Sequence, residues 1–293
     1  MNDSTIPFRT VRRLAVRSAA IISKIDDSRA GAYARKLIAR LEQKAIRVSL
    51  NEITAGLDLI IVLGGDGTLL HIAEHAARYS IPVIGINLGN LGFLTELTEN
   101  ETEHALDKII GETVIIENRL MLKARIISEG QPSSYRYALN EIVINKNTMD
   151  RLLHLATYAG PDYITTYKAD GLIFSTPTGS TAYNLSAGGP LVHPGSATIL
   201  VTPICPFMLS SRPIILPSTK IITTEFQGRG DSECAQIIID GQHAWTLQSG
   251  SIVEIQEAEH RLQLIATSKR DYFTVLRNKL HWGSQEDAKK APR

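Results

Sequence analysis

The hydrophobic pattern of this 293-residue chain changes near Val114, and this change constrains the fold more than any other feature of the sequence. Before Val114, short apolar runs typical of buried strands alternate with segments of helical periodicity. From there to about Thr267 the chain consists mostly of short runs with period-two alternation or β-branched residues. We therefore expect an α/β N-terminal domain with a parallel sheet, and a β-rich, β-sandwich-like C-terminal domain.

In the first region, strand-like and helix-like segments follow one another with short connections. The strand-like segments are Val11–Arg17, Ile46–Leu50, Leu57–Leu63 and Pro82–Asn87, and the helical ones are Ser28–Gln43 and Thr68–Tyr79. Thr98 and Glu101 form a capping box that predicts the start of a further helix, which Gly111 ends. This order is typical of a parallel sheet covered by helices.

In the second region, seven runs predict strands, and the Asp240-Gly241 pair between two of them predicts a hairpin. The runs are Lys123–Ile127, Tyr135–Ile144, Leu152–Tyr158, Lys220–Phe226, Ala235–Ile239, Ser251–Gln256 and Arg261–Ala266. One helix is expected near Ser180–Ser186 and another over Tyr272–Leu280, followed by a charged tail, Gln285–Arg293, that we expect to be disordered. The predicted division of the chain is residues 1–118, 119–267 and 268–293.

The charge and apolar content exclude several classes of protein. The chain has 31 Lys and Arg against 30 Asp and Glu, so no basic excess is available for binding nucleic acid through bulk electrostatics. Its apolar runs are shorter than the ~18 residues of a membrane helix, and we expect no membrane span. Two cysteines, Cys205 and Cys234, are too few for a disulfide scaffold, and the N-terminal segment lacks the features of a secretion signal. We expect a cytoplasmic protein.

The sharpest local motif is Gly64-Gly65-Asp66-Gly67-Thr68, which joins an apolar strand to an amphipathic helix. Glycines let a ligand approach the backbone closely, and the free N–H groups of a helix N-terminus attract anions. Asp66 could simply cap the helix. However, a cap does not require glycine on both sides, so the motif favours a functional role for Asp66. The chain has no G-x-x-x-x-G-K-[ST] motif, which argues against a P-loop enzyme.

A second motif extends from Asp170 to Pro190 and concentrates hydroxyl groups and glycines around one aromatic residue, Tyr183. Such a set suits a nucleoside, whose sugar and phosphate oxygens need several hydrogen-bond partners. A Ser/Thr-rich surface turn is the alternative, and the density of these groups disfavours it. The pair Asn140-Glu141, at the start of a β-branched run, is a weak signal by itself.

His71-Ile-Ala-Glu74-His75 matches the H-x-x-E-H pattern of some zinc proteases, with both histidines on one helical face. Five residues match readily by chance. The helix begins directly at the glycine-rich turn, and no motif for a third ligand accompanies the pair. The zinc interpretation is therefore disfavoured, and the sequence identifies no metal ligands.

Taken together, these motifs resemble the bacterial NAD kinase family, in order, from about residue 58 onward. The segments that carry the resemblance are Gly64–Thr68, Asn87–Glu96, Asn140-Glu141, Asp170–Pro190 and Pro203–Pro206. The Gly-Gly-Asp-Gly-Thr element is the less specific part, because diacylglycerol kinases, sphingosine kinases and phosphofructokinases resemble it there. The block from Asp170 to Pro190 is much more specific.

The resemblance implies transfer of the ATP γ-phosphoryl group to the adenosine-ribose 2′-hydroxyl of NAD, with a divalent metal such as Mg²⁺, giving NADP. It implies an N-terminal domain like those of phosphofructokinase and diacylglycerol kinase, an active site between the domains, and a C-terminal segment that packs back on the first domain. It also implies a homo-oligomer, a dimer or tetramer, in which a neighbouring subunit completes part of the NAD site.

The resemblance also implies roles for individual residues. Asp66 corresponds to the proposed general base, which accepts the proton of the 2′-hydroxyl. Asn140 and Glu141 match the pair that holds the adenosine ribose, and Phe93 matches an adenine-side contact. The remaining implied NAD contacts are Gly67, His71, Arg151, Lys168, Asp170, Thr181, Ala182, Tyr183, Asn184, Leu185, Ser186 and Gln242.

Three departures from the family pattern bear on these implications. Phe207 occupies a position that is commonly His in relatives, so a polar role there is lost. Lys168 occupies a variable position near the nicotinamide end, often Arg. Its charge would repel a cationic nicotinamide ring but attract phosphate oxygens, so the choice between NAD and NADH stays open. The segment Arg12–Arg29 lacks the Asn-Pro-like turn of many relatives.

Two other functions remain as alternatives. A lipid kinase could share the glycine-rich turn, but it would need a membrane-facing basic or apolar surface and would not need Asn140-Glu141. An NAD-binding sensor without chemistry would be expected to lose Asp66 first, and Asp66 is present. The sequence leaves open the phosphoryl donor, ATP or polyphosphate, as well as the preferred metal, inhibition by NADPH and the oligomeric state.

Overall fold

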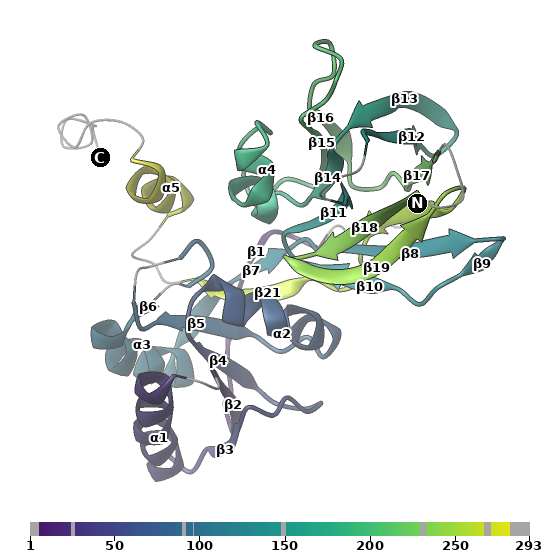
Figure 1. Cartoon of the computed structure of the whole chain (residues 1–293). Coiled ribbons are helices and arrows are strands. Elements are labelled where there is room, and N and C mark those ends of the chain that lie inside the picture. Colours follow the sequence, from purple (N-terminus) through teal and green to yellow (C-terminus); the bar gives the residue numbers. More distant parts are fainter. Residues whose placement is uncertain are drawn as a thin grey trace. The chain divides into compact units, whose positions relative to one another are not determined.

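The computed structural model describes residues 6–24, 27–89, 92–95, 97–147, 151–228, 233–266 and 271–281. The chain divides into two compact units (Figure 1). Unit 1 consists of Met1–Asn118 and Gln263–Arg293, and unit 2 of Arg119–Leu262. The predicted charged tail, Gln285–Arg293, lies outside the described residues.

Unit 1 is built on a sheet with the strand order β1-β7-β21-β5-β4-β2-β3, in which β6 also pairs with β5. The strands are β1 (Arg9–Arg13), β2 (Ser18–Ser23), β3 (Arg47–Leu50), β4 (Leu59–Leu63), β5 (Val83–Asn87), β6 (Leu97–Thr98), β7 (Thr113–Arg119) and β21 (Leu262–Ala266). The central pairs are parallel, whereas β1 and β7 form an antiparallel edge. The expected α/β domain with a parallel sheet is confirmed.

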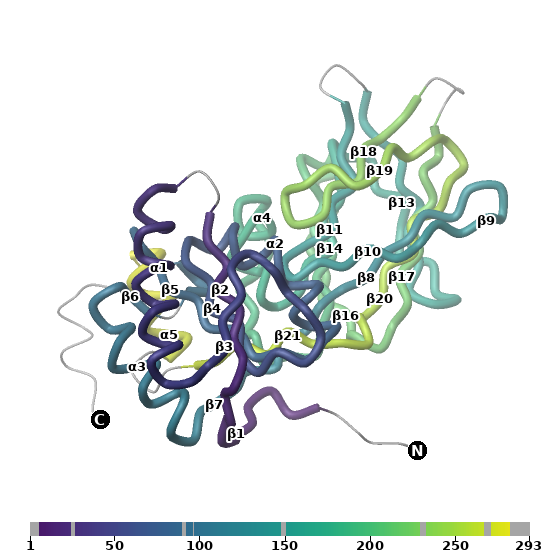
Figure 2. The backbone as a smooth tube through the Cα atoms, turned by 90° about the horizontal axis from the view of Figure 1, so that it is seen from below, coloured from purple at the N-terminus to yellow at the C-terminus, as the bar shows by residue number. Residues whose placement is uncertain are grey.

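The helices of unit 1 are α1 (Ser28–Gln43), α2 (Asp66–Arg78), α3 (Glu99–Gly111) and α5 (Tyr272–Leu280). α1 and α3 lie side by side in both views (Figure 1, Figure 2), and Arg40 of α1 forms ion pairs with Glu103 and Asp107 of α3. The capping box of Thr98 and Glu101 is present as predicted. In the described part of the chain, no helix is long and apolar enough to cross a membrane.

Apolar contacts attach α1 and α3 to one face of the sheet. Leu37 of α1 and Leu106 of α3 belong to one buried cluster with alternate residues of β4, such as Ile61. Side chains alternate between the two faces of a strand, and Ile60 and Val62, which are also fully buried, point to the opposite face. α2 contacts β4 and β5. Helices and sheet together therefore bury β4 completely, as its continuous apolar sequence predicts.

Unit 2 contains two antiparallel sheets. The first has the order β10-β8-β20-β17-β12-β13, with β9 beside β8, and the second β16-β15-β14-β11-β18-β19. The first contains β8 (Leu122–Ser128), β9 (Gln131–Pro132), β10 (Arg136–Ala138), β12 (Leu153–Ala159), β13 (Asp162–Ala169), β17 (Ile222–Phe226) and β20 (Ile252–Glu257). The second contains β11 (Glu141–Lys146), β14 (Gly171–Ser175), β15 (Thr198–Ile204), β16 (Ile214–Pro217), β18 (Cys234–Ile239) and β19 (Gln242–Gln248).

Phe226 of the first sheet and Phe174 of the second belong to one buried core, which confirms the predicted sandwich-like architecture. A 3₁₀ turn, η1 (Thr178–Thr181), and a short helix, α4 (Tyr183–Ser186), follow β14 where one helix was expected. The hairpin at Asp240-Gly241 is confirmed, since both residues have positive φ, 46° and 79°.

Three sequence expectations were wrong in detail. The run Tyr135–Ile144 is two strands, β10 and β11, because the chain turns at Leu139 and Asn140. The run Arg261–Ala266 forms a strand, but β21 pairs in parallel with β5 in the sheet of unit 1 and not within the antiparallel sandwich. The run Val11–Arg17 spans the end of β1 and the connection to β2. Local alternation indicates a strand but not its partner.

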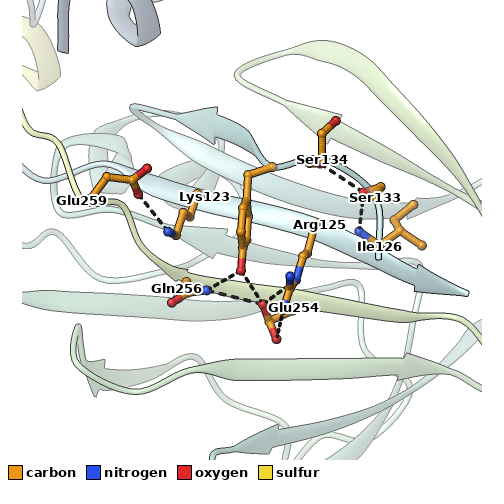
Figure 3. A network of polar contacts seen from close by, with 9 residues as sticks. Lys123, Arg125, Ile126, Ser133, Ser134, Glu254, Gln256 and Glu259 are labelled. Atoms are coloured by element: carbon orange, nitrogen blue, oxygen red, sulfur yellow. Dashed lines mark hydrogen bonds and ion pairs between the residues drawn. The ribbon is translucent and has the colours of Figure 1, made fainter. Parts of the chain in front are cut away.

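A network of polar contacts links β8, β20 and the segment before β10 in unit 2 (Figure 3). Tyr135 lies between the cations of Lys123 and Arg125, 4.5 and 4.8 Å from its ring centre, and its hydroxyl donates to Glu254. Glu254 also accepts from Arg125, and Glu259 pairs with Lys123. Because these charges are satisfied within the network, we assign it to stability.

Candidate functional site

Asp66 is the first residue of α2, directly after the turn that ends β4. The N-cap of α2 is Gly65, and no side chain caps the helix. The carboxylate of Asp66 instead accepts two backbone N–H groups of a distant loop, from Phe93 at 2.8 Å and from Leu94 at 3.0 Å. The alternative that Asp66 serves as the helix cap is therefore excluded.

The loop that donates these two N–H groups is organised by Thr95, whose side chain is almost completely buried. The Thr95 hydroxyl accepts from the backbone N–H of Gly92 at 2.9 Å and from the amide of Asn87 at 3.2 Å. Asn87 in turn accepts from the N–H of Gly89 at 2.7 Å. These hydrogen bonds fix the described part of the loop after β5 and align it with Asp66. Asn90, Leu91 and Glu96 of the predicted motif lie outside the described residues.

The glycines that flank Asp66 have no packing role. A Cβ atom at Gly65 or Gly67 would meet no heavy atom within 4 Å, and neither residue has a positive φ. The fold itself would therefore accept a side chain at both positions. The absence of side chains leaves the backbone beside the Asp66 carboxylate open to close approach by a ligand.

His71 and His75 lie exposed on α2, one turn apart. Glu74, which lies between these two histidines in the H-x-x-E-H pattern, forms an ion pair of 2.8 Å with Arg78. Within the ranges that the structure describes, no group of three or more His, Cys, Asp or Glu residues could hold a metal ion.

In unit 2, Asn140 and Glu141 stand at the start of β11. Glu141 is 6% exposed, and its Oε2 atom has no hydrogen-bond partner among the residues that the structure describes. Burial and the nearby charge of Asp240 raise the pKa of Glu141 to about 8, although the backbone N–H of Tyr183 acts in the opposite direction. Glu141 is therefore mostly a neutral acid at pH 7, with an unused oxygen.

The segment from Thr178 to Ser186 is held in place by Asn184, which is completely buried. The amide of Asn184 donates to the carbonyls of Ser180 and Pro190, and its oxygen accepts from the hydroxyl of Thr202 at 2.7 Å. The side chain of Asn184 is thus fully used within the fold, whereas Tyr183 is 41% exposed.

Asp170 follows β13 and forms an ion pair of 2.7 Å with Lys146, the last residue of β11. Lys168 is exposed on β13, opposite His154 of β12, and its carbonyl accepts from the N–H of Phe207 at 2.8 Å. Phe207 is 70% exposed. The charge of Asp170 is therefore balanced by a residue that the sequence motifs did not include.

The predicted residues form separate groups in the two units. Asp66 and Phe93 are joined directly in unit 1, where Gly67 and His71 belong to the same helix as Asp66. In unit 2, the carboxyl group of Glu141 accepts the backbone N–H of Tyr183, so the Asn140-Glu141 pair lies beside the segment that contains Thr181, Ala182, Leu185 and Ser186. Arg151 and Gln242 are exposed in unit 2.

Sequence reasoning missed three residues that organise these groups: Thr95, Lys146 and Asp240. The sequence indicated only a turn role for Asp240, and Lys146 lies two residues beyond the predicted run Tyr135–Ile144. Thr95 belongs to the motif Asn87–Glu96, but nothing in the spacing of this motif indicates that one hydroxyl accepts hydrogen bonds from both Gly92 and Asn87. All three roles depend on contacts that local sequence patterns do not encode.

Comparison with known proteins gives the same result for both halves of the chain. Residues 15–114 match the ATP-NAD kinase N-terminal domain, and residues 139–267 match the ATP-NAD kinase C-terminal domain. The NAD kinase of Geobacter metallireducens is 39% identical over 285 residues, which cover 92% of this chain and 100% of that protein. The NAD kinase of Syntrophotalea carbinolica is 44% identical over 228 residues, 78% of this chain and 79% of that protein.

Solved structures share the fold. An NAD kinase from Archaeoglobus fulgidus in complex with ATP has a TM-score of 0.73 at 25% identity, covering 91% of this chain and 100% of that one. A yeast NADH kinase complexed with NADH has a TM-score of 0.85 at 23% identity, with 92% and 89% covered. Since both domain families match in order and the bacterial relatives align over most of their length, this chain belongs to the NAD kinase family.

Proposed function

We propose that this protein is an ATP-dependent NAD kinase, which transfers the γ-phosphoryl group of ATP to the adenosine-ribose 2′-hydroxyl of NAD. Family membership and the names of the bacterial relatives support this activity. The structural observation that best supports this activity is the arrangement of the Asp66 carboxylate. It does not cap its own helix, and it accepts two backbone N–H groups of a distant loop. It also lies between two glycines, Gly65 and Gly67, that packing does not require.

Asp66 acts as the general base. The N–H groups of Phe93 and Leu94 orient its carboxylate, and each oxygen keeps a lone pair for a further partner. In the reaction, a bond forms between the 2′-oxygen and the γ-phosphorus, and the bond from this phosphorus to the β,γ-bridging oxygen breaks. The proton of the 2′-hydroxyl passes to Asp66, and ADP leaves.

NAD binding is assigned to the residues of both units that the family resemblance singled out. Asn140 and Glu141 hold the adenosine ribose, and a neutral Glu141 can donate a hydrogen bond to a ribose oxygen as well as accept one. The exposed ring of Tyr183 offers an aromatic face. The other proposed contacts are Gly67, His71, Phe93, Arg151, Lys168, Asp170, Thr181, Ala182, Leu185, Ser186 and Gln242.

For Asn184 we propose a supporting role, because its amide is engaged with Ser180, Pro190 and Thr202. The Lys146–Asp170 ion pair and Lys168 give this part of unit 2 two positive charges against one negative. Where these three charged residues face the nicotinamide ring, their net positive charge favours the neutral ring of NADH over the cationic ring of NAD. A comparison of the two substrates tests this point directly.

A divalent metal is implied by phosphoryl transfer from ATP. The residues that the structure describes include no cluster of three or more potential ligands, so they do not fit a metal cage made by protein alone. Mg²⁺ is commonly bound through the phosphates of its substrate with few protein ligands. We therefore propose that the metal arrives with ATP. The proposal further includes a cytoplasmic homo-oligomer.

The test is formation of NADP by the purified protein with ATP, Mg²⁺ and NAD, measured with an NADP-specific dehydrogenase. NADH, polyphosphate and diacylglycerol serve as parallel substrates. NADP formation from NAD and ATP is the expected result. Binding of NAD without any product would instead support a sensor, and phosphorylation of diacylglycerol alone would support a lipid kinase.

A further inference from the structure

Asp240 lies in the tight turn between β18 and β19, in the left-handed conformation with φ of 46°. Its side chain turns back toward the segment that precedes β11. Oδ2 accepts the backbone N–H of Leu139 at 2.7 Å, and Oδ1 accepts those of Asn140 and Glu141 at 2.8 and 3.0 Å. Its own N–H donates to the carbonyl of Glu141 at 3.0 Å. One residue thus binds three consecutive backbone N–H groups.

The carbonyl groups of the same segment are bound from another element. The Thr176 hydroxyl donates to the carbonyl of Leu139 at 2.6 Å, and the Thr176 N–H donates to that of Asn140 at 2.9 Å. The Ser175 hydroxyl makes a longer bond of 3.3 Å to the carbonyl of Asn140. Gly179 packs so closely on Asn140 that a Cβ there would lie 2.2 Å from its carbonyl oxygen. The backbone of Leu139–Glu141 is therefore fixed on both its donor and its acceptor sides.

The backbone segment Leu139–Glu141 lies next to residues that are proposed to bind NAD. It contains Asn140 and Glu141 themselves. Thr176, which binds the segment, lies two residues before Thr178, where the turn that leads to Tyr183 begins. Gln242 follows Asp240 by two residues. The described partners of the partly buried Asp240 carboxylate are backbone N–H groups, and burying a carboxylate is costly unless several donors bind it. Asn or Ser would suffice for a turn, so the three-way hydrogen bonding is the feature that requires a carboxylate.

We infer that Asp240 is a positioning residue of the NAD site, which sets the placement of Asn140 and Glu141 through their backbone N–H groups. The inference rests on the proposed function, in which these two residues hold the adenosine ribose. A residue that acts in this way affects NAD binding more than the chemical step, and it leaves ATP binding unchanged.

The experiment is steady-state kinetics of Asp240→Asn in the full-length protein. The substitution keeps the size of the side chain, but its amide group would face at least one backbone N–H, so a hydrogen bond is replaced by a contact between two donors. We expect the KM for NAD to rise by about tenfold or more, the KM for ATP to stay within about twofold, and kcat to fall less than the KM rises.

Asp162→Asn is the matched control, because Asp162 is an exposed Asp at another hairpin of unit 2 and its side chain forms an ion pair of 3.4 Å with Lys220. Its kinetics should equal those of the wild type.

A general loss of stability in Asp240→Asn would lower the active fraction, and hence kcat, without raising the KM for NAD. An unchanged KM for NAD, or equal rises for NAD and ATP, would overturn the inference.

Thr176 provides a second, independent pair of variants if Asp240→Asn does not fold. Thr176→Val removes the hydrogen bond to the Leu139 carbonyl and the one that the hydroxyl accepts from the N–H of Gly179, and Thr176→Ser keeps the hydroxyl and both bonds. The Val variant should raise the KM for NAD and the Ser variant should restore it.

The combination of Asp240→Asn with Glu141→Gln should weaken NAD binding by less than the product of the two single effects, measured by calorimetry. Independent, multiplicative effects would contradict an action of Asp240 through Glu141. If the wild type makes no NADP at all, the proposed function fails. If it makes NADP while Asp240→Asn binds NAD normally, only this inference fails.

Discussion

Gly92 lies so close to Asp66 that a Cβ atom at position 92 would be 1.9 Å from Oδ1 of the carboxylate. Phe93 and Leu94, the next two residues, donate their N–H groups to the same carboxylate. Glycine is required at position 92 because a Cβ atom there would overlap the carboxylate of Asp66. The catalytic assignment of Asp66 and the structure of the loop after β5 are thus linked.

Gly92→Ala is expected to reduce NADP formation by about 10²-fold, because the new methyl group must displace either the loop or the carboxylate. Circular dichroism should show that the protein remains folded. Gly111→Ala is the control, since a Cβ there would meet nothing within 4 Å and Gly111 is exposed at the end of α3. Full activity of Gly92→Ala would show that the position of Asp66 relative to this loop does not matter for the reaction.

Asp66→Asn is expected to reduce kcat by roughly 10²- to 10⁴-fold, because it removes the proposed proton acceptor. Its amide nitrogen cannot accept from Phe93 or Leu94, so one of these two hydrogen bonds is also lost, and a modest rise of the KM for NAD should accompany the change. Asp27→Asn is the matched control, since Asp27 caps α1 and Asn caps a helix equally well. Loss of NAD binding with unchanged turnover per bound NAD would contradict the role of Asp66 as general base.

The stability of unit 2 should fall as the pH rises through the titration of Glu141. The pKa of this residue is raised to about 8 in the folded protein by burial and by Asp240, from an ordinary value near 4.5. The folded state therefore binds more protons than the unfolded state between these values. The stabilisation is complete below about pH 4.5 and is lost as the pH rises to about 8. Its full size is on the order of a few kcal/mol.

Glu141→Gln removes this titration, and thermal unfolding of the wild type and the variant between about pH 5 and about pH 9 measures the effect. The wild type should lose stability relative to Glu141→Gln across this interval. A difference between the two proteins that does not vary with pH would show that Glu141 titrates normally.

Thr202→Val should destabilise unit 2 by about 1–3 kcal/mol, because it leaves the buried oxygen of Asn184 without a donor. Thr202→Ser keeps the hydroxyl and should be closer to the wild type. Denaturation by urea, followed for each variant, gives the comparison. Equal stability of Thr202→Val and the wild type would mean that water or another group satisfies Asn184.

Sequence patterns predicted much of the local structure, and particular elements show why. Two helices, Ser28–Gln43 and Tyr272–Leu280, have the predicted bounds, and the capping box at Thr98 and the hairpin at Asp240-Gly241 are present. Each of these features depends on residues within a few positions of one another: apolar spacing, a cap or a turn conformation.

Pairing between strands was less predictable. The alternation in Arg261–Ala266 indicated a strand, but nothing in the run indicated that β21 would lie beside β5. Likewise, the run Tyr135–Ile144 contains no Gly or Pro to mark the break at Leu139 and Asn140. That break is maintained by Asp240 and Thr176, which lie far away in the chain.

The sequence by itself determined the family, the glycine-rich turn with Asp66, and the residues proposed to bind NAD, because motifs and short-range periodicity are written in neighbouring positions. Only the tertiary structure decided how those residues are held. Asp66 is bound by a loop 27 residues away, and Asp240 by a segment about 100 residues away. Such contacts depend on how strands pair across the chain, and this long-range packing leaves no local signal in the sequence.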